Sequence, residues 1–299
     1  MIKQNIYKIV LKVLRLLGLD HYIPDELYLR MLFYRVFGKK LNLDNPKTYN
    51  EKLQWMKLNY RPAILSKLVD KNEVKFFVAN KIGKEYVIPT LGVWKSVNDI
   101  DFNSLPDQFV LKCTHDSGGV IIVKEKAKFD IREASKKLAA CLSKNHYWSG
   151  REWPYKNVVP RIIAEPYLED KTTHELSDYK FFCFNGIVKI VMVATERQTG
   201  HTKFDFYDTN FQHLPFRWGH DHSSQELKKP QGFEAMLEVA ANLSSGFPHV
   251  RVDLYNVEGK IYFGELTFFH WSGMCPFEPE EWDMKFGNWL NLPDVCQHS

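Results

Sequence analysis

Apolar residues recur along the chain with two different periods, and the helical period dominates the first part of the sequence. Between residues 5 and 19 the apolar and basic positions separate onto different faces of a helix: Ile6, Ile9, Val10, Val13, Leu16 and Leu17 against Lys8, Lys12 and Arg15. This pattern predicts an amphipathic helix. Such a helix either packs on its own protein or rests on an anionic cytoplasmic membrane surface, and the sequence leaves both interpretations open.

The periodicity changes near residue 62. Residues 24 to 60 favour helices, with prolines as breaks, whereas short β-branched strands and helices alternate from there on. We predict helices at 70–82, 130–144 and 231–245, and strands at 86–89, 109–112, 119–123, 159–164, 179–184, 188–194, 250–255 and 260–265. Asn185-Gly186 and Gly259 predict hairpin turns. The order of elements is that of an α+β or α/β protein.

Composition narrows the class of protein. The chain has 299 residues, 44% of them hydrophobic and 25% charged, which is typical of a globular protein with a sizeable core. A net charge of +4 is too small to indicate a nucleic-acid partner, and we expect none. Five cysteines without a C-x-x-C pair argue against a disulfide framework or a zinc site. No secretory signal and no apolar run of about 20 residues is found, so we expect a cytoplasmic protein.

A strand, a small polar loop and a second strand follow one another over residues 109–123. Lys112 ends the first strand, and Gly118 and Gly119 lie in the loop, where glycine lets backbone N–H groups approach an anion closely. The segment is neither a P-loop nor a dinucleotide fingerprint, because both glycine patterns are absent. A lid over phosphates and a hairpin with a flexible tip are both compatible with it.

Acidic and basic residues gather around the hairpin over residues 250–267. Arg251 and Asp253 alternate with apolar residues and therefore share one strand face, and Glu265 ends the partner strand. Two converging carboxylates suit Mg²⁺, and an arginine beside them suits a phosphate oxygen. The alternative is an exposed hairpin with surface ion pairs.

Three further features complete the candidate chemistry. Lys71 and Lys75 are four residues apart and should share a helix face, where solvated charge is the alternative. A strand ends at Glu165, and extended backbone there could pair with the edge of an adenine. Asp178 and Lys180 share a strand face.

Together these segments resemble the ATP-grasp enzymes, most closely the TupA-like group, named after a teichuronopeptide biosynthesis protein. The resemblance covers residues 25 to 290 and rests on ordered motifs: Asp70-Lys71, Lys112 before the glycine loop, Glu165, Arg251-x-Asp253 and Glu265-x-Thr267, with the segments 109–119, 151–156, 177–186 and 264–268. It implies an α+β fold of two lobes that clasp ATP. The implied divisions are a helical N-terminal region (1–62), an N-terminal lobe with its lid (63–170), a C-terminal core with a magnesium site (171–290) and a tail (291–299).

The resemblance also implies roles for individual residues. Residues that would bind ATP are Lys71 and Lys112 for the phosphates, His115, Ser117, Gly118 and Gly119 in the lid, Glu165, Tyr167 and Leu168 at the adenine, and Asp178 near the ribose. Mg²⁺ would be bound by Asp253, Glu265 and Thr267, although many ATP-grasp enzymes have asparagine at the last position. Catalytic roles fall to Arg251 on the transferred phosphoryl group, to Lys180 on the developing charge, and to Arg197 facing a substrate carboxylate.

The implied reaction is that of a carboxylate–amine ligase that passes through an acyl phosphate. The group's link to cell-surface polysaccharides implies a sugar carboxylate, such as a hexuronic acid, joined to an amino acid or amine. Alternatives are a phosphotransferase acting on a sugar or lipid-linked hydroxyl, a glycosyltransferase using Asp99-Ile-Asp101, and a non-catalytic adaptor; we interpret Asp99-Ile-Asp101 as a surface loop. Two features favour ordinary packing: His220-Asp221-His222 as a polar turn, and Trp148, Trp153, Trp218 and Trp271 as core side chains.

Overall fold

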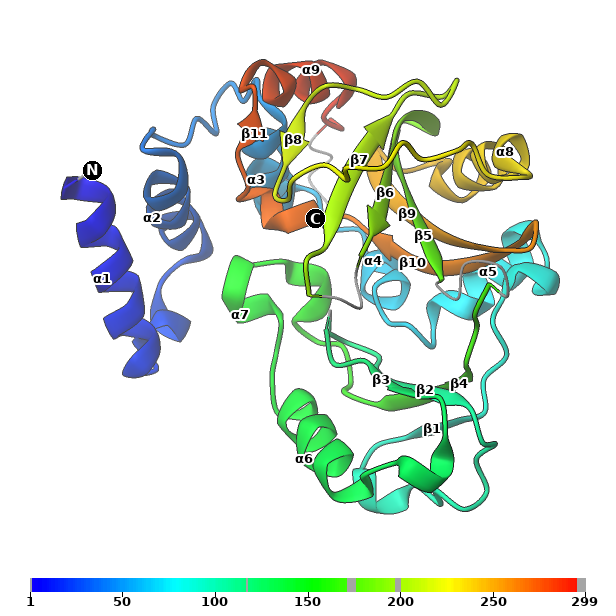
Figure 1. Cartoon of the computed structure of the whole chain (residues 1–299). Helices are drawn as coiled ribbons and strands as arrows, with labels where there is room; N and C mark the ends of the chain where they lie inside the picture. Colours follow the sequence, from blue (N-terminus) through cyan, green and yellow to red (C-terminus); the bar gives the residue numbers. More distant parts are fainter. Residues whose placement is uncertain (1, 117, 171–175, 197–199, 295–299) are drawn as a thin grey trace.

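The computed structural model describes residues 2–116, 118–170, 176–196 and 200–294. Two antiparallel sheets with helices around them make up most of the molecule, so the α+β class predicted from the sequence is confirmed. The four-stranded sheet has the order β1-β4-β2-β3 and the five-stranded sheet the order β10-β9-β5-β6-β7. Figure 1 shows the smaller sheet below the larger one, with helices α4 and α5 between them. The arrangement creates a boundary between two sheets at which side chains from both can meet.

The N-terminal segment forms two helices that pack on each other beside the rest of the molecule (Figure 1): α1 (Ile2–Leu16) and α2 (Asp25–Phe37). Leu11 is buried against Tyr28 and Leu32 of α2. Arg15 donates to the hydroxyl of Tyr28 and to the carbonyl oxygen of Ser149, which ties α1 to the body of the protein. One face of α1 is therefore packed, and its other faces are exposed.

Helix α3 (Tyr49–Asn59), from the N-terminal part of the chain, packs against the core of the larger sheet. It begins at a capping box, in which the Thr48 hydroxyl accepts from the backbone N–H of Glu51 and the Glu51 carboxylate accepts from the N–H of Thr48. Inside the core the Tyr49 hydroxyl lies 2.9 Å from the Nε2 atom of His249. Helix α9 (Glu281–Trp289) packs against α3.

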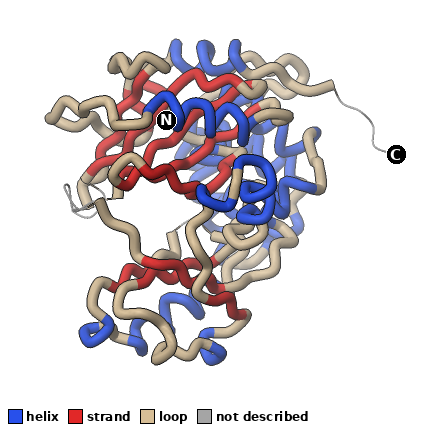
Figure 2. Tube along the Cα trace, turned by 90° about the vertical axis from the view of Figure 1, so that its right-hand side faces the viewer, coloured by secondary structure: helices blue, strands red, loops and turns tan. Residues whose placement is uncertain are grey.

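The smaller sheet is built from short strands: β1 (Gly92–Trp94), β2 (Phe109–Cys113), β3 (Ile121–Val123) and β4 (Ile162–Pro166). Helix α6 (Ile131–Leu142) covers one face, where Leu138 and Cys141 join the cluster around Phe109 and Leu111. Figure 2 shows this sheet as a separate layer below the larger one. The short helix α7 (Tyr147–Gly150) follows α6.

The larger sheet carries most of the core. Its strands are β5 (Ser177–Phe184), β6 (Ile187–Thr195), β7 (Lys203–Tyr207), β9 (His249–Val257) and β10 (Lys260–Thr267). Helix α8 (Phe233–Ser244) packs on one face, where Phe181 meets Phe233. The opposite face is apolar at Phe182 and Phe184 and charged at Asp178 and Lys180, because alternate residues of β5 point the same way. A small third sheet pairs β8 (Arg217–Trp218) with β11 (Phe277–Glu278).

Both predicted hairpins are present. Asn185 and Gly186 have φ values of 51° and 79° between β5 and β6, and Glu258 and Gly259 have 52° and 85° between β9 and β10. Positive φ at both central positions is what a type I′ turn requires, and asparagine and glycine tolerate it best. The sequence therefore predicted these two connections of the larger sheet correctly.

Other predicted elements were wrong. Residues 86–89 form no strand: Lys84–Tyr86 is a 3-10 helix, and Val87 makes a single parallel bridge to Phe263. The predicted helix at 70–82 begins only at Val74, where α5 (Val74–Ile82) starts, because residues 70–73 form a turn. Strands β1 and β7 and helix α9 were not predicted, since three to nine residues carry too little periodicity to distinguish an element from a loop.

No helix in the described part of the chain combines the length and the apolar character needed to cross a lipid bilayer.

Replacing Gly287 by alanine should destabilise the fold although alanine favours helices. A Cβ atom there would lie 2.1 Å from the carbonyl oxygen of Lys47 and 2.9 Å from the backbone of Thr48 and Tyr49, so α9 would have to move away from α3. We expect a loss of about 1–3 kcal/mol in the free energy of unfolding, measured by chemical denaturation. Met284→Ala, on the exposed side of the same helix, should change it by less than about 0.5 kcal/mol. Equal effects of the two variants would contradict this account of the packing.

Candidate functional site

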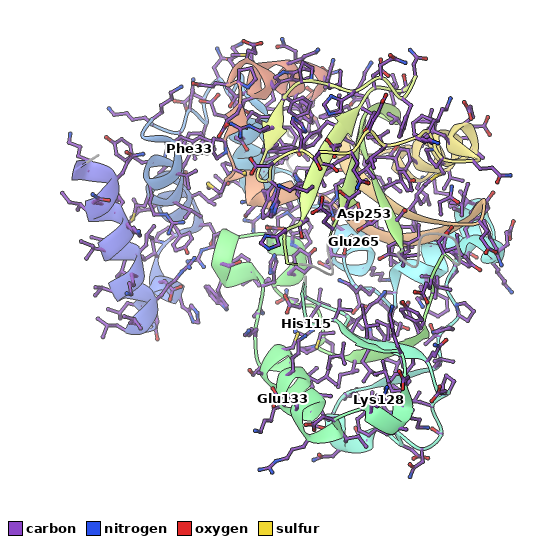
Figure 3. All side chains as sticks on the ribbon, viewed as in Figure 1. Phe33, His115, Lys128, Glu133, Asp253 and Glu265 are labelled. Carbon is purple, nitrogen blue, oxygen red and sulfur yellow. The ribbon has the colours of Figure 1, made fainter. Side chains whose placement is uncertain are left out.

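The charged residues of the larger sheet lie opposite one another on three adjacent strands. Lys180 of β5 faces Asp253 of β9, and Asp253 faces Glu265 of β10. An irregularity between Phe263 and Glu265 shifts the register of β10, which places Glu265 opposite Asp253. The convergence of Asp253 and Glu265 that the sequence suggested is therefore present, and Figure 3 shows both side chains at the edge of the sheet that faces His115.

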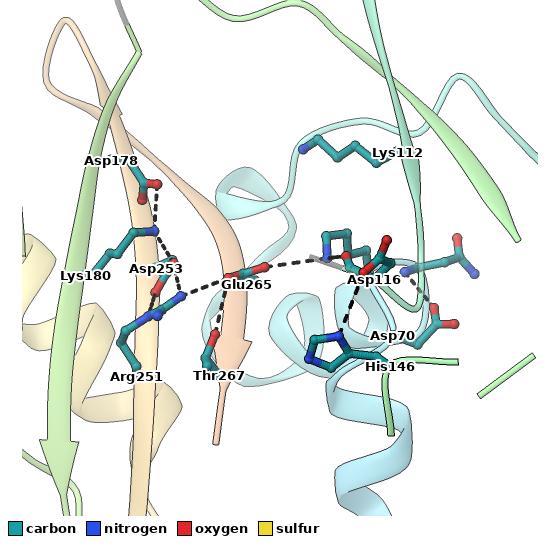
Figure 4. Close-up of polar contacts among 12 residues, drawn as sticks. Asp70, Lys112, Asp116, His146, Asp178, Lys180, Arg251, Asp253, Glu265 and Thr267 are labelled. Atoms are coloured by element: carbon teal, nitrogen blue, oxygen red, sulfur yellow. Dashed lines mark hydrogen bonds and ion pairs between the residues drawn. The ribbon is translucent and has the colours of Figure 1, made fainter. Parts of the chain in front are cut away.

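Arg251 is the centre of an ion-pair network in this group (Figure 4). Its Nε and Nη2 atoms lie 2.6 and 2.8 Å from the two carboxylate oxygens of Asp253, and Nη2 also lies 2.9 Å from Oε1 of Glu265. Lys180 pairs with Asp178 at 2.6 Å and with Asp253. The Thr267 hydroxyl donates to Glu265 at 3.2 Å. Asp178, Lys180, Arg251 and Asp253 are buried, so their charges depend on one another more than on water.

Lys71 joins this network from the other side of the boundary between the sheets. Its ammonium lies 3.5 Å from Oε2 of Glu265 and donates to the carbonyl oxygen of Asp116 at 2.7 Å. The Glu265 side chain keeps 31% of its surface exposed, whereas that of Asp253 keeps 2%. Glu265 is thus the carboxylate through which the larger sheet meets the turn that carries Lys71.

The pKa values of Glu265 and Asp253 are shifted in opposite directions. Burial opposes ionisation of Glu265, but Lys71 first, and then Arg251 and Lys180, hold its pKa well below its ordinary value. Burial raises the pKa of Asp253 despite Arg251 and Lys180, and the neighbouring carboxylates Glu265 and Asp178 raise it further. A site with crowded carboxylates favours the arrival of an additional cation.

His270 fixes the outer end of the Arg251 guanidinium. Burial, reinforced by Arg251 and Lys180, lowers the pKa of His270 well below its ordinary value, so the ring is neutral and Nδ1 accepts from Nη1 of Arg251. The ring stands edge-on to Phe182 and to the fully buried Trp218. Its Nε2 atom is buried and has no hydrogen-bond partner in the described residues. Only the fold brings His270 next to Arg251, so this contact could not be predicted from the sequence.

Two lysines share one carboxylate at the smaller sheet. Glu165 of β4 accepts from Lys112 of β2 at 2.7 Å and from Lys75 of α5 at 2.6 Å. Burial raises the pKa of Glu165, yet Lys112 and Lys75 lower it more, so the carboxylate is ionised. Lys75 was not among the predicted site residues. Lys71 and Lys75 do not share a helix face, because Lys71 precedes the start of α5, and they contact different carboxylates.

Asp70 explains why Lys71 stands where it does. Its carboxylate accepts from the backbone N–H groups of Asn72 and Glu73 at 2.8 and 3.0 Å, and from the Thr114 hydroxyl and Arg161 at 3.0 Å each. The backbone N–H of Lys71 also donates to the carbonyl oxygen of Thr114. These bonds fasten the turn before α5 to the end of β2.

The glycine loop has one open and one packed glycine. A Cβ atom on Gly118, where φ is 134°, would meet nothing within 4 Å, whereas one on Gly119 would lie 2.4 Å from the sulfur of Cys141. His115 is buried and its Nε2 atom lies 3.1 Å from the carbonyl oxygen of Lys144, so its ring is directed toward the end of α6. Ser117 lies outside the described residues.

The remaining predicted residues have less defined surroundings. Tyr167 and Leu168 are half-buried in the chain that follows β4, and the ammonium of Lys124 lies 5.2 Å from the centre of the Tyr167 ring. Arg197 lies outside the described residues. His146, which the sequence analysis did not single out, lies 3.9 Å from Asp116 and 3.7 Å from Glu152.

Comparison with known proteins gives a family match and more distant structural matches. The family model described as TupA-like ATPgrasp matches residues 51–291, and no curated protein matches. D-alanine–D-alanine ligase from Bacillus anthracis, solved with ATP, has 15% identity and a TM-score of 0.39, over 69% of this chain and 55% of that one. L-amino acid ligase from Bacillus licheniformis has 13% identity and a TM-score of 0.42, over 75% of this chain and 49% of that one. Biotin carboxylase from Campylobacter jejuni has 12% identity and a TM-score of 0.40, over 82% of this chain and 49% of that one.

The chain thus spans about half the length of these solved enzymes, and the resemblance to them is weak. The family match is of a different kind, because it covers most of the sequence and includes every residue of the ion-pair groups around Glu265 and Glu165. The chain belongs to the TupA-like ATP-grasp family.

Proposed function

We propose that this protein is an ATP-dependent carboxylate–amine ligase. One observation carries the proposal: Asp253 and Glu265 lie opposite each other on adjacent strands, with Arg251 between them and Lys71 only 3.5 Å from Glu265. Carboxylates, which suit a metal ion, and cations, which suit a triphosphate, thus lie in one group in a chain of the ATP-grasp family, and this supports the proposal. ATP would lie between the two sheets, with Lys71 and Lys112 near its phosphates.

The donor set fits Mg²⁺. Asp253 and Glu265 supply carboxylate oxygens and Thr267 a hydroxyl, all hard ligands, and Glu265 is partly exposed. Burial, together with the neighbouring carboxylates Glu265 and Asp178, raises the pKa of Asp253, and a bound cation would favour its ionised form. When bound, Mg²⁺ would neutralise phosphate charge and orient the phosphoryl group for transfer.

The chain's own residues would then exchange carboxylate partners for phosphate oxygens. The guanidinium of Arg251 forms planar paired contacts with Asp253 and Glu265, and this geometry suits the transferred γ-phosphoryl group equally well. Neutral His270 would hold the guanidinium in place without competing for negative charge. Lys180 would offset the charge that develops as ADP leaves.

The chemistry proceeds in two balanced steps. A substrate carboxylate oxygen attacks the γ-phosphorus, the bond to ADP breaks, and an acyl phosphate forms. An amine then attacks the acyl carbon, inorganic phosphate leaves with the bonding electrons, and the amine loses a proton. No protein nucleophile takes part, so the residues contribute positioning and electrostatic stabilisation.

A hexuronic acid is the proposed carboxylate substrate, and an amino acid the proposed amine. A cavity of about 540 Å³ opens beside the His270 loop and is lined by polar groups that include Lys203, Arg217, His220, Asp221 and Glu278. Trp271 follows His270, keeps 43% of its surface exposed and lies over Gly219, where a Cβ atom would be 3.0 Å from the indole. An exposed indole beside planar polar groups suits a sugar ring.

The other tryptophans named from the sequence do not have this character. Trp218 is fully buried, Trp148 stacks on His21, and Trp153 donates its indole N–H to the carbonyl oxygen of Tyr60. Trp271 is therefore the one of the four whose surroundings support ring stacking with a substrate, and the interpretation as a core side chain is wrong for it.

A phosphotransferase remains the second candidate, because the same phosphate site would serve a hydroxyl acceptor. The surroundings of Asp99-Ile-Asp101 do not support the glycosyltransferase alternative. The Asp99 carboxylate accepts from the backbone N–H of Ser96, and that of Asp101 accepts from the N–H of Asn103, so both carboxylates stabilise local turns on the surface.

Helix α1 supports a peripheral position on an anionic membrane. Ile6, Ile9, Leu16 and Leu17 keep 52, 62, 76 and 64% of their surfaces exposed, while Leu11 is packed against α2 on the opposite face. No acidic residue occurs in residues 1–19, and four basic ones do. An apolar face flanked by cations is typical of helices that lie in the headgroup region of a bilayer. On this proposal the enzyme works at the cytoplasmic surface.

The ligase proposal predicts a trapped intermediate. With ATP, Mg²⁺, hydroxylamine and the correct hexuronic acid, free or as a nucleotide sugar, the protein should release ADP and form a hydroxamate, read by colour and mass. Asp253→Asn and Glu265→Gln should each lower this rate by about 100-fold or more, because they remove charge at the phosphoryl group. Glu234→Gln, on the exposed side of α8, should leave it unchanged. A phosphorylated sugar that forms without any amine would identify a phosphotransferase instead.

Trp271→Ala should separate substrate binding from nucleotide binding. We expect the KM for the sugar acid to rise by about 10-fold, equivalent to about 1.4 kcal/mol of binding free energy, while stabilisation of the protein by Mg-ATP stays the same. Thermal unfolding with ATP and steady-state kinetics over sugar acid concentrations provide the two measurements. An unchanged KM would remove Trp271 from the substrate site.

The membrane proposal predicts sedimentation with vesicles of phosphatidylglycerol and phosphatidylcholine, and not with phosphatidylcholine alone. Ile9→Glu and Leu16→Glu should abolish it, because they place charge on the buried face of the bound helix. Ile187→Glu, equally exposed in the hairpin that joins β5 to β6, should retain it. Should Leu16→Glu instead convert a dimer into a monomer, the face would belong to a contact between two copies of the chain.

A further inference from the structure

A group of metal-ligating side chains lies on the larger sheet away from the charged network. Asp205 belongs to β7, at the edge of the sheet, and pairs with Val193 on the face that carries Tyr179 and Phe181 rather than Asp178 and Lys180. His213 and His222 come from the long connection between β7 and α8, residues 208–232, which includes the short strand β8. Among the described residues these three side chains are the group whose ligand atoms approach one another closely enough to hold one metal ion, within 4.8 Å.

The distances match the spacing of ligands around a tetrahedral ion. Oδ1 of Asp205 lies 3.2 Å from Nε2 of His213 and 3.1 Å from Nδ1 of His222. Ligand atoms about 2.0–2.1 Å from a tetrahedral zinc ion are about 3.3–3.4 Å apart. The two histidine nitrogens lie within 4.8 Å of each other, so a reorientation of the two rings would bring all three atoms to the spacing that the ion requires.

The carboxylate is held in position by its surroundings. Asp205 is 3% exposed, and its second oxygen accepts from the backbone N–H of Ser223 at 3.2 Å. Contacts of this kind orient a ligand and leave its other oxygen for the metal. Nδ1 of His222 also lies 3.1 Å from the carbonyl oxygen of Phe204. Without an ion, Nδ1 of His222 would be protonated and would donate to the Phe204 carbonyl oxygen and to Asp205. With an ion bound at Nδ1, the ring would adopt the tautomer with its hydrogen on Nε2.

Solvent reaches the group from one side. A cavity of about 550 Å³ is bounded by both histidines together with Pro215, Arg217, Glu278 and Pro279. The Arg217 guanidinium pairs with Asp221 and Glu278, so its charge is compensated next to the site. A water molecule from this cavity could supply a fourth ligand, and three protein ligands with one open position form a common zinc coordination.

We propose that Asp205, His213 and His222 bind Zn²⁺ and fasten the connection after β7 to the edge of the larger sheet. The ligands are two imidazoles and one carboxylate, a set that suits zinc better than magnesium. The polar-turn interpretation of His220-Asp221-His222 then holds for Asp221, which pairs with Arg217, but not for His222. The same connection carries Trp218, whose ring stands against His270, so the ion would stabilise the support of the substrate pocket without touching the reacting groups.

The test uses untagged full-length protein that has been treated with EDTA and dialysed. Titration calorimetry with ZnCl₂ should show one site per chain with a dissociation constant at or below about 1 µM. Saturating Zn²⁺ should raise the melting temperature by about 3 °C or more, as expected when a ligand is present well above its dissociation constant. Co²⁺ in the same site should give the visible absorption of a tetrahedral complex.

His213→Gln and His222→Gln should each weaken zinc binding at least 50-fold and remove the cobalt spectrum. His213 is the sharper variant, because its side chain is 45% exposed and its loss should leave the zinc-free melting temperature unchanged. His220→Gln is the matched control in the same connection and should bind zinc like the wild type. The proposal would be overturned if the wild type failed to bind zinc at concentrations 10-fold above the expected dissociation constant, or if both ligand variants still bound it. The three residues would then be a hydrogen-bonded aspartate–histidine group. Neither outcome bears on the ligase reaction.

Discussion

The contact on which the proposed site depends is the carboxylate of Glu265, which meets Arg251 on one side and Lys71 on the other. Arg251 belongs to the larger sheet, whereas Lys71 belongs to a turn that Asp70 ties to the end of β2 in the smaller one. A single acidic side chain thus joins elements nearly two hundred residues apart in sequence. If the two sheets moved apart here, Glu265 would stay paired with Arg251 but Lys71 would lose its carboxylate partner, so this ion pair favours the closed arrangement.

The arrangement as a whole pairs carboxylates with cations in a largely buried region, with one cation more than carboxylates because two lysines share Glu165. Asp178, Asp253 and Glu265 face Lys71, Lys180 and Arg251, and Lys75 and Lys112 share Glu165 on the smaller sheet. A polyphosphate that entered between the sheets would find cations whose present partners are carboxylates, and a divalent ion would find carboxylates whose present partners are those cations. Binding would therefore exchange partners within an existing network, with less reorganisation than assembly of a new one.

Aromatic packing gives this polar network its rigidity. His270 lies against Trp218 and Phe182, and through its contact with Arg251 the core determines where the guanidinium points. The segment from His270 to Gly273 adopts positive φ at Trp271 and Ser272, conformations that cost energy in residues other than glycine. Buried Lys57 donates to the carbonyl oxygen and the hydroxyl of Ser272, which holds the segment in that shape. The exposed indole of Trp271 is a consequence of this geometry.

By itself the sequence narrowed the class to α+β or α/β, and it determined the two hairpins and the strand that carries Arg251 and Asp253 on one face, because turn chemistry and alternation are local properties. It also determined the family, through the order of short motifs. The tertiary structure alone decided that Lys75 pairs with Glu165, that His270 orients Arg251, and that His222 approaches Asp205 rather than acting with His220. These contacts join residues from separate elements, and which side chains meet there depends on how sheets and helices pack, which no local period records.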